Sequence, residues 1–240
     1  YQNKDLNIKY AYKKSLDYYD TLYEYFGVQK NNKEVLELCQ KYDNVYGTVG
    51  YHPEFAKTTS LHDLDVLETY LNCDKIVGVG EIGLDYYWVK DNKEIQKKLF
   101  IKELELAEKY NLPVIIHSRD AVQDVYDILK TRNLRGSIHC YSGSTEMAKE
   151  FIKIGFNIGI DGPITFKNNK KQREMVKNID INHILVETDS PYLSPEPNRG
   201  KVNTSLNLVY ILKQIAIELD REYEEIKEIT TNNARNLFKI

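Results

Sequence analysis

The sequence predicts an α/β fold, with a TIM-type α/β barrel as the natural candidate. Predicted strands, loops and helices alternate from Val45 onward with no linker, repeat or low-complexity break, and this pattern favours a parallel sheet. The length of 240 residues suits one large domain and lies close to the ~250 residues of an α/β barrel. Ligand-type side chains also fall near the ends of several predicted strands, where barrels carry their active sites. We therefore expect a single α/β-barrel domain over residues 1–240.

The first 30 residues are expected to form an atypical N-terminal helical segment. Apolar and aromatic residues recur at helical spacing over residues 10–26, and Gly27 follows as a stop signal. Asn32 is a candidate N-cap for a second helix that ends near Tyr42. Two helices therefore follow each other with almost no strand between them.

The remaining elements follow from runs of apolar residues with alternating or helical spacing. Strands are predicted over residues 45–50, 76–81, 112–117, 137–141, 156–160 and 183–189. Helices are predicted over residues 61–71, 94–110, 120–131, 145–154, 169–178, 205–218 and 222–238. Ser118 and Asp120 are the candidate caps for the helix over residues 120–131.

Composition indicates a globular protein of a reducing compartment. The chain has 42% hydrophobic and 29% charged residues, and no apolar run approaches the ~18 residues of a membrane span. Its three cysteines show no C-x-x-C spacing, which argues against a disulfide framework. No signal-peptide pattern is present at Tyr1, so we expect a cytoplasmic protein, with the nucleus also compatible. A net charge of −3 gives no general attraction for a polyanion.

The strand over residues 76–81 carries the first candidate functional residue. A β-branched run bounded by glycines leads to Glu81, and a charge at the end of an apolar strand is costly unless it is paired or binds a cation. An ion pair and a metal site both satisfy that requirement. His117, His139 and Asp189 also fall at or near the carboxyl ends of predicted strands. A single strand-end histidine is often only hydrogen-bonded, but the four residues together favour a mixed nitrogen and oxygen site for one or two divalent metals, with zinc, manganese or magnesium compatible.

Several motifs strongly resemble the TatD family of metal-dependent deoxyribonucleases. They occur in the family's order and lie at residues 79–87, 112–120, 138–144, 164–168, 187–193 and 233–238. The resemblance covers about residues 31–240. It implies a TIM-type barrel of the metal-dependent hydrolase class, up to two divalent metal ions, and DNase activity of the 3′-to-5′ exonuclease type.

The resemblance also implies roles for the candidate metal ligands. Glu81 would bridge the two metals, and His117 and His139 would complete one metal site. Asp189 would serve the other metal and orient the attacking water, so Glu81 and Asp189 are the expected catalytic residues.

Further positions match the parts of the family that bind substrate. His52 resembles the histidine on the phosphate side of the site. The expected contacts to the DNA backbone are Arg119, Tyr141, Arg199 and Lys201, since a guanidinium or ammonium group suits phosphate.

The chain departs from the family pattern in two places. Family members begin with a strand that bears a His-x-His pair, and no histidine precedes His52 here. The N-terminal strands are therefore expected to be incomplete or atypical. The loop over residues 199–205 also lacks the family's usual Glu-Pro after the asparagine.

These observations predict a metal-dependent deoxyribonuclease that hydrolyses phosphodiester bonds with a metal-activated water. One alternative keeps the barrel and the metals but acts on another phosphoester or an amide, because barrels host many chemistries. Another is an inactive nucleic-acid-binding member that lacks the first-strand histidine pair. DNA is the expected partner, with no membrane and no obligate protein partner. Metal content separates the inactive form from the enzymes, and a substrate panel separates the two enzymes.

Overall fold

The computed structural model describes residues 22–23, 32–88 and 90–240. Most of the helix predicted over residues 10–26 therefore lies outside the described residues. Within that range Leu22–Tyr23 form a short strand, β1, so the helix prediction is wrong at these two positions. The described contacts group the chain into two compact units. The expectation of a single domain stays a prediction, and each unit is described by itself.

The first unit comprises the described residues of Tyr23–His139, Ile154–Phe156 and Leu237–Ile240, and we call it the β2–β5 unit. Its strands are β2 (Val45–Val49), β3 (Ile76–Asp85), β4 (Val114–Arg119) and β5 (Gly136–Ile138). Each strand pairs in parallel with the next. The predicted α/β class with parallel strands is confirmed in this unit.

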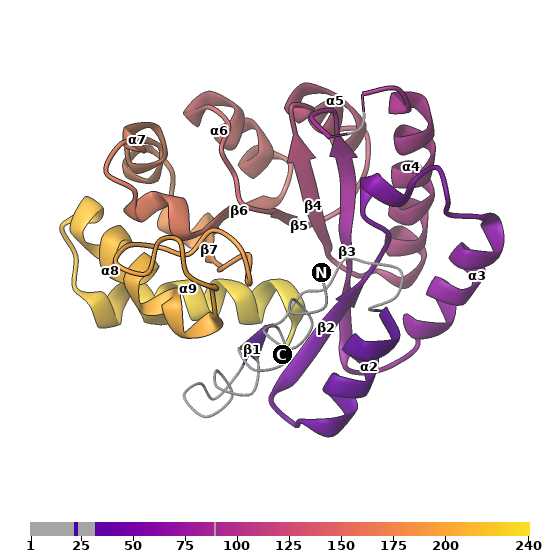
Figure 1. Cartoon of the computed structure of the whole chain (residues 1–240), viewed down its shortest axis with the longest axis horizontal. Helices are drawn as coiled ribbons and strands as arrows, with labels where there is room; N and C mark the ends of the chain where they lie inside the picture. Colours follow the sequence, from indigo (N-terminus) through magenta and orange to yellow (C-terminus); the bar gives the residue numbers. More distant parts are fainter. Residues whose placement is uncertain (1–21, 24–31, 89) are drawn as a thin grey trace. The chain divides into compact units, whose positions relative to one another are not determined.

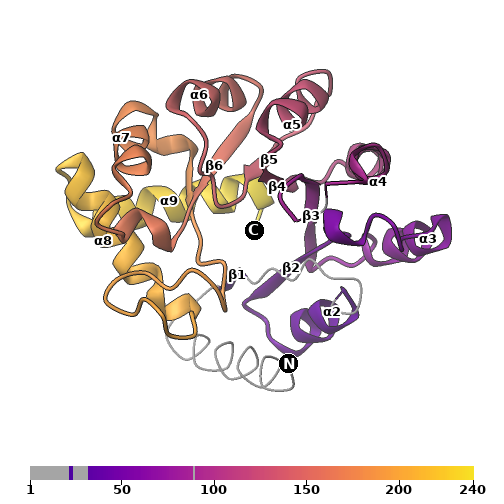
Figure 2. The ribbon, with the colours of Figure 1, turned by 45° about the horizontal axis from the view of Figure 1, so that its top comes forward.

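Four helices lie on one side of these strands (Figures 1 and 2); the first precedes β2, and the other three connect consecutive strands. They are α2 (Asn32–Lys41), α3 (Leu61–Tyr70), α4 (Lys93–Tyr110) and α5 (Val122–Leu129). A capping box starts α3, because Ser60 and Asp63 each accept from the other's backbone N–H. Asn111 in the left-handed conformation ends α4.

The predicted caps of α2 and α5 are wrong, because Asn32 has a tertiary partner and because neither Ser118 nor Asp120 caps α5. The Asn32 side chain pairs with both backbone groups of Gly50, at 3.2 and 3.3 Å, and thereby fixes the chain just before His52. Ser118 belongs to β4, and the first turn of α5 has no side-chain cap.

The core of the β2–β5 unit is formed between its strands and helices. Strand β3 is buried over its whole length, and it pairs with a parallel strand on each edge, β2 and β4. Fully buried side chains from the strands and from α3 and α4 include Val79, Ile82, Leu84, Val114, Ile116, Leu67, Phe100 and Leu104.

The second unit comprises the described residues of Tyr1–Leu22, Cys140–Lys153 and Asn157–Asn236, and we call it the β6–β7 unit. Strand β6 (Phe156–Ile160), whose first residue belongs to the first unit, pairs in parallel with β7 (Ile184–Val186). The helices are α6 (Thr145–Lys153), α7 (Lys170–Asn178), α8 (Leu208–Leu219) and α9 (Tyr223–Phe238), whose last two residues belong to the first unit. Lys177 of α7 and Glu218 of α8 form an ion pair at 2.8 Å.

Short 3₁₀ turns complete both units. They are η1 (Pro53–Phe55), η2 (Gly162–Thr165), η3 (Ile181–His183) and η4 (Ser205–Asn207). Among the described residues, none of the helices combines the length and the apolar character that a membrane crossing requires.

Candidate functional site

Five side chains of the β2–β5 unit form what we call the histidine–carboxylate cluster. His52 follows β2 and caps η1, Glu81 and Asp85 lie on β3, His117 lies on β4, and His139 directly follows β5. Three neighbouring parallel strands and one loop therefore supply the cluster. The carboxyl ends of parallel strands are where an α/β sheet places its ligands.

His117 is at the centre of the cluster. Its Nδ1 lies 3.0 Å from Glu81 Oε1, and its Nε2 lies 2.9 Å from Asp85 Oδ2. His139 Nε2 lies 3.9 Å from the same Glu81 oxygen. The His52 ring meets the His117 ring edge-on, with 4.3 Å between the centroids. Glu81 therefore has histidine rings from two strands beside one oxygen.

The charges of the cluster are coupled. Burial alone would lower the pKa of His117, but hydrogen bonds to Asp85 and Glu81 outweigh it and raise the pKa to about 9. Burial opposes ionisation of Glu81, yet His139 and His117 hold the pKa of Glu81 below its usual value. Burial lowers the pKa of His52, which favours the neutral imidazole that a metal requires.

Backbone contacts fix Asp85 at the end of β3. Gln96 of α4 accepts from the Asp85 N–H and donates to the Asp85 carbonyl, each at 2.8 Å. The Asp85 Oδ1 accepts the backbone N–H groups of Tyr87 and Trp88, at 2.9 and 2.8 Å. The other oxygen, Oδ2, is thereby directed at His117.

A similar contact holds the loop that carries His52. The Tyr51 N–H donates to Oε1 of Glu103 on α4, at 2.6 Å. Glu103 is fully buried, and burial raises the pKa of its carboxyl well above the ordinary value, although the Tyr51 N–H opposes the shift. Helix α4 therefore supports two parts of the cluster from behind, through Gln96 and through Glu103.

The cluster fits a divalent metal ion. One ligand atom each from His52, Glu81 and His117 lies within 4.8 Å of the others, and nitrogen and oxygen ligands bind zinc at about 2.0–2.2 Å. Imidazole and carboxylate donors without thiolate suit zinc, manganese and related ions. Asp85 on the far nitrogen of His117 is the hydrogen bond that orients a ligating histidine.

The structure brings together four of the residues predicted for the site. Glu81, His117 and His139, the predicted metal ligands of the β2–β5 unit, lie in the cluster. His52, predicted to bind substrate, lies there as well and is itself placed as a candidate metal ligand. Their roles remain predictions.

Arg119, a predicted DNA contact, lies at the end of β4 next to exposed aromatic rings. Its guanidinium is 4.3 Å from the centroid of the Tyr87 ring and 5.3 Å from that of the Trp88 ring. The backbone carbonyl of Arg119 accepts from the N–H of Tyr86. The turn after β3 is therefore attached to the end of β4.

The other predicted site residues belong to the β6–β7 unit. Asp189 follows β7 in a left-handed conformation with φ 50°, and its loop is held by Asn203, which donates to the carbonyls of Thr188 and Tyr192. The strand predicted to reach Asp189 ends at Val186.

The remaining three have local partners in the same unit. The Tyr141 hydroxyl donates to the Ser144 carbonyl at 2.8 Å, and burial raises the pKa of Tyr141 above its usual range. The Arg199 guanidinium lies 4.2 Å from the centroid of the Phe166 ring. Lys201 donates to the Asn198 side chain at 3.4 Å.

Asp85 has no role in the sequence prediction, although it lies in the cluster. The strand was predicted to end at Glu81, whereas β3 continues to Asp85. With the longer strand, the two-residue period places both carboxylates on one face. The Glu-x-x-x-Asp spacing could therefore have identified Asp85 as a site residue.

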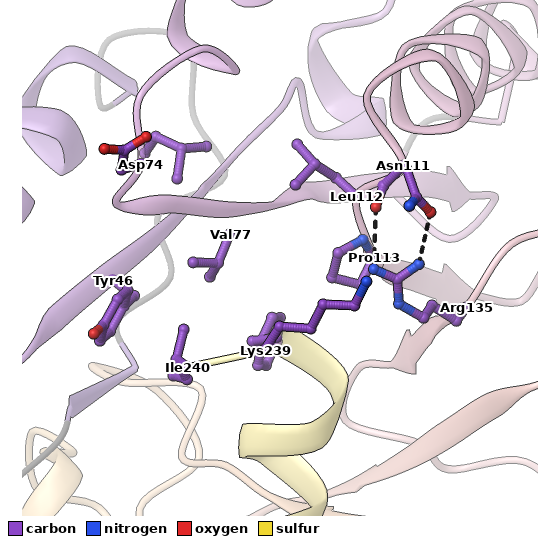
Figure 3. A pocket seen from close by; sticks show the side chains of 11 residues that line it. Tyr46, Asp74, Val77, Asn111, Leu112, Pro113, Arg135, Lys239 and Ile240 are labelled. Carbon is purple, nitrogen blue, oxygen red and sulfur yellow. Dashed lines mark hydrogen bonds between the residues drawn. The ribbon is translucent and has the colours of Figure 1, made fainter.

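The β2–β5 unit also contains a pocket of about 280 Å³ at the amino ends of its strands (Figure 3). Its walls include Tyr46, Pro113, Arg135 and Lys239, and Arg135 is bound to the side chain and the carbonyl of Asn111. No residue predicted for the site lines this pocket. The pocket and the histidine–carboxylate cluster are therefore separate features of the unit.

Comparisons with known proteins identify the family of this chain. The family model described as TatD related DNase matches residues 4–239. The uncharacterized metal-dependent hydrolase YabD of Bacillus subtilis is 43% identical over 208 residues, which are 85% of this chain and 82% of that protein. The uncharacterized metal-dependent hydrolase YcfH of Escherichia coli K12 is 34% identical, over 85% of this chain and 77% of its own length.

A solved structure extends the match to the fold. The crystal structure of YJJV, a TatD homologue from Escherichia coli K12, aligns with a TM-score of 0.89 and 28% identity, over 100% of this chain and 93% of that one. The predicted TIM-type barrel class of metal-dependent hydrolases is confirmed by this likeness. The chain belongs to the TatD-related DNase family of metal-dependent hydrolases.

Proposed function

We propose that this protein is a metal-dependent deoxyribonuclease that hydrolyses DNA phosphodiester bonds, as a 3′-to-5′ exonuclease. The observation that carries the proposal is the histidine–carboxylate cluster, in which Glu81 lies beside both His117 and His139. DNase is also the activity in the description of the matching family. Imidazole and carboxylate donors suit zinc and manganese, and magnesium would bind through the carboxylate and water.

Glu81, His117, His139 and His52 would hold the metal. A bound divalent ion polarises a phosphoryl oxygen and lowers the pKa of water, so that hydroxide becomes available near neutral pH. Asp85 accepts the Nε2 proton of His117, so Nδ1, which lies beside Glu81, is the nitrogen that would bind the metal. Gln96 and the turn at Tyr87 keep Asp85 in that position, and this preorganisation limits reorganisation during the reaction.

Asp189 is the residue that we propose for orienting the attacking water. Its carboxylate follows a parallel strand, as an active-site residue of a barrel does. The two hydrogen bonds from Asn203 fix the loop around it. A loop held by these two hydrogen bonds suits a carboxylate that must keep one orientation.

Digestion of an end-labelled single-stranded DNA tests the proposal. We expect shortening from the 3′ end with magnesium, manganese or zinc and none after treatment with EDTA. Glu81→Ala should abolish cleavage because the residue shared by both histidines is removed. Glu228→Ala, at an exposed position on α9, should keep full activity.

Two outcomes would contradict the assignment. Absence of cleavage by the folded, metal-supplemented chain would exclude nuclease activity, and a panel of phosphomonoesters and amides would then identify another hydrolase reaction. Equal cleavage by the Glu81→Ala protein would exclude the histidine–carboxylate cluster as the active centre.

A further inference from the structure

An exposed group of two aromatic rings and a guanidinium lies next to the histidine–carboxylate cluster. We call Tyr87, Trp88 and Arg119 the Trp88 platform. Trp88 is 62% exposed and Tyr87 is 45% exposed, and their rings meet edge-on with centroids 4.8 Å apart. The guanidinium of Arg119 contacts both rings, so all three side chains form one ordered surface.

The platform is attached to the cluster by a single carboxylate. Asp85 accepts the backbone N–H groups of Tyr87 and Trp88 on one oxygen and holds His117 with the other. Only one buried side chain therefore separates the Trp88 backbone from the His117 ring. A ligand on the platform would lie beside a phosphate bound at the cluster.

The chemistry of the platform fits one kind of ligand. Large exposed aromatic side chains beside a functional site mark binding surfaces, and a planar guanidinium stacks on rings and binds phosphate. Proteins that bind single-stranded nucleic acid combine these features, because every base has a π-face. A base inside a duplex presents only its edges, so the ligand must be unpaired.

We propose that Trp88 binds an unpaired nucleobase of the substrate by stacking, with Arg119 beside it for the adjoining phosphate. The inference rests on the proposed nuclease function and adds how the strand is held. It makes the Trp88 platform a determinant of preference for single-stranded or frayed ends over blunt duplex ends. Specificity for base identity is not expected from stacking alone.

Tryptophan fluorescence measures this contact directly, because Trp88 is the one tryptophan of the sequence. The purified chain is titrated with a single-stranded oligonucleotide whose phosphorothioate linkages resist hydrolysis. Stacking on the indole should quench the emission. A strand of equal length with abasic sugars keeps its backbone charge and should quench far less, and a blunt duplex should also quench less.

Anisotropy of the same phosphorothioate strand, now carrying a fluorescent end label, provides a second measurement. Trp88→Ala should weaken binding about 5- to 150-fold, since one stacked base contributes about 1–3 kcal/mol, and Trp88→Phe should recover part of the loss. Leu61→Ala, at an apolar position that is 74% exposed, should bind as tightly as the unchanged chain.

The outcomes separate this inference from the nuclease proposal. Unchanged emission at saturating DNA, or equal binding by Trp88→Ala, would overturn the platform even if the chain cleaves DNA. Quenching and weakened binding without cleavage would support the platform and exclude the nuclease. Equal quenching by the abasic strand would show that phosphate contacts alone hold the DNA and would overturn stacking.

Discussion

The carboxyl group of Glu103 joins helix α4 to the backbone beside His52. It is completely buried and accepts the Tyr51 N–H through Oε1, while Oε2 has no hydrogen-bond partner in the part of the chain that the structure describes. An ionised carboxylate with one donor in a buried site is costly. Burial accordingly raises the pKa of Glu103 well above its usual value.

Replacement of Glu103 by glutamine should reveal that cost through the pH dependence of stability. A group whose pKa is raised in the folded state adds to the free energy of unfolding. That contribution is complete below the unfolded pKa of about 4.3 and is lost as the pH rises toward the folded pKa. The amide of Glu103→Gln can still accept the Tyr51 N–H and does not titrate. Urea unfolding at pH 5 and pH 7 should therefore show that the free energy of unfolding of the variant rises relative to that of the unchanged chain, by at most about 1.4 kcal/mol per pH unit.

Glu105→Gln on the same helix is the matched control, because Glu105 is exposed and pairs with Lys102. Its stability difference should change little between the two pH values. A difference for Glu103→Gln that stays constant with pH would mean that Glu103 is ionised in the folded protein, contrary to this expectation.

At the scale of elements, the approach of β3 to β4 depends on Gly83. Gly83 pairs with His117 in the parallel register, and a Cβ at Gly83 would lie 2.1 Å from the His117 carbonyl oxygen. Gly83 also has φ +145°, a conformation that side chains disfavour. The absence of a side chain here lets β4 place His117 between Glu81 and Asp85.

Gly83→Ala should therefore destabilise the protein by about 1–3 kcal/mol, the cost of forcing extra atoms into a packed site. Thermal unfolding measures the loss. Gly155→Ala is the control that separates the cost of the backbone conformation from the cost of the steric clash. Gly155 has φ +91°, but its added Cβ would meet only the Leu134 carbonyl oxygen, at 3.5 Å. Equal losses in the two variants would assign the effect at Gly83 to backbone conformation and exclude the clash with β4.

The same glycine explains where element prediction from sequence fails. The alternation of strands and helices from Val45 onward is confirmed, because burial in a parallel sheet leaves continuous apolar runs. The strand was predicted to end at Glu81, before Gly83, whereas β3 continues to Asp85. The glycine is required by a neighbouring strand, and contacts between distant segments are not encoded in local spacing. Asp85 was missed for that reason.

The candidate site, like the strands and helices, was predictable only in part. Glu81, His117 and His139 were expected at strand ends, and parallel pairing of β3, β4 and β5 brings them together. The support from Gln96 and Glu103 was not predictable, since both are polar residues on a helix with no motif. Their role depends on which face of α4 meets β3 and on the depth of burial.

At the scale of the whole molecule, metal binding should stabilise the folded chain, because the histidine–carboxylate cluster joins segments that are far apart in the unfolded chain. At a hundredfold excess over the dissociation constant, an ion that binds only the folded form adds about 2.7 kcal/mol. For a chain of this size, that gain corresponds to a rise in Tm of about 5–10 °C. Scanning calorimetry with zinc, manganese and magnesium, each against EDTA, measures the shift.

Asp85→Asn should reduce metal affinity about 10- to 100-fold because the charge that orients His117 is lost. Glu81→Ala should remove most of the shift in Tm. An unchanged Tm with all three ions would contradict a metal site at the cluster, whereas a full shift in Glu81→Ala would place the bound ion elsewhere.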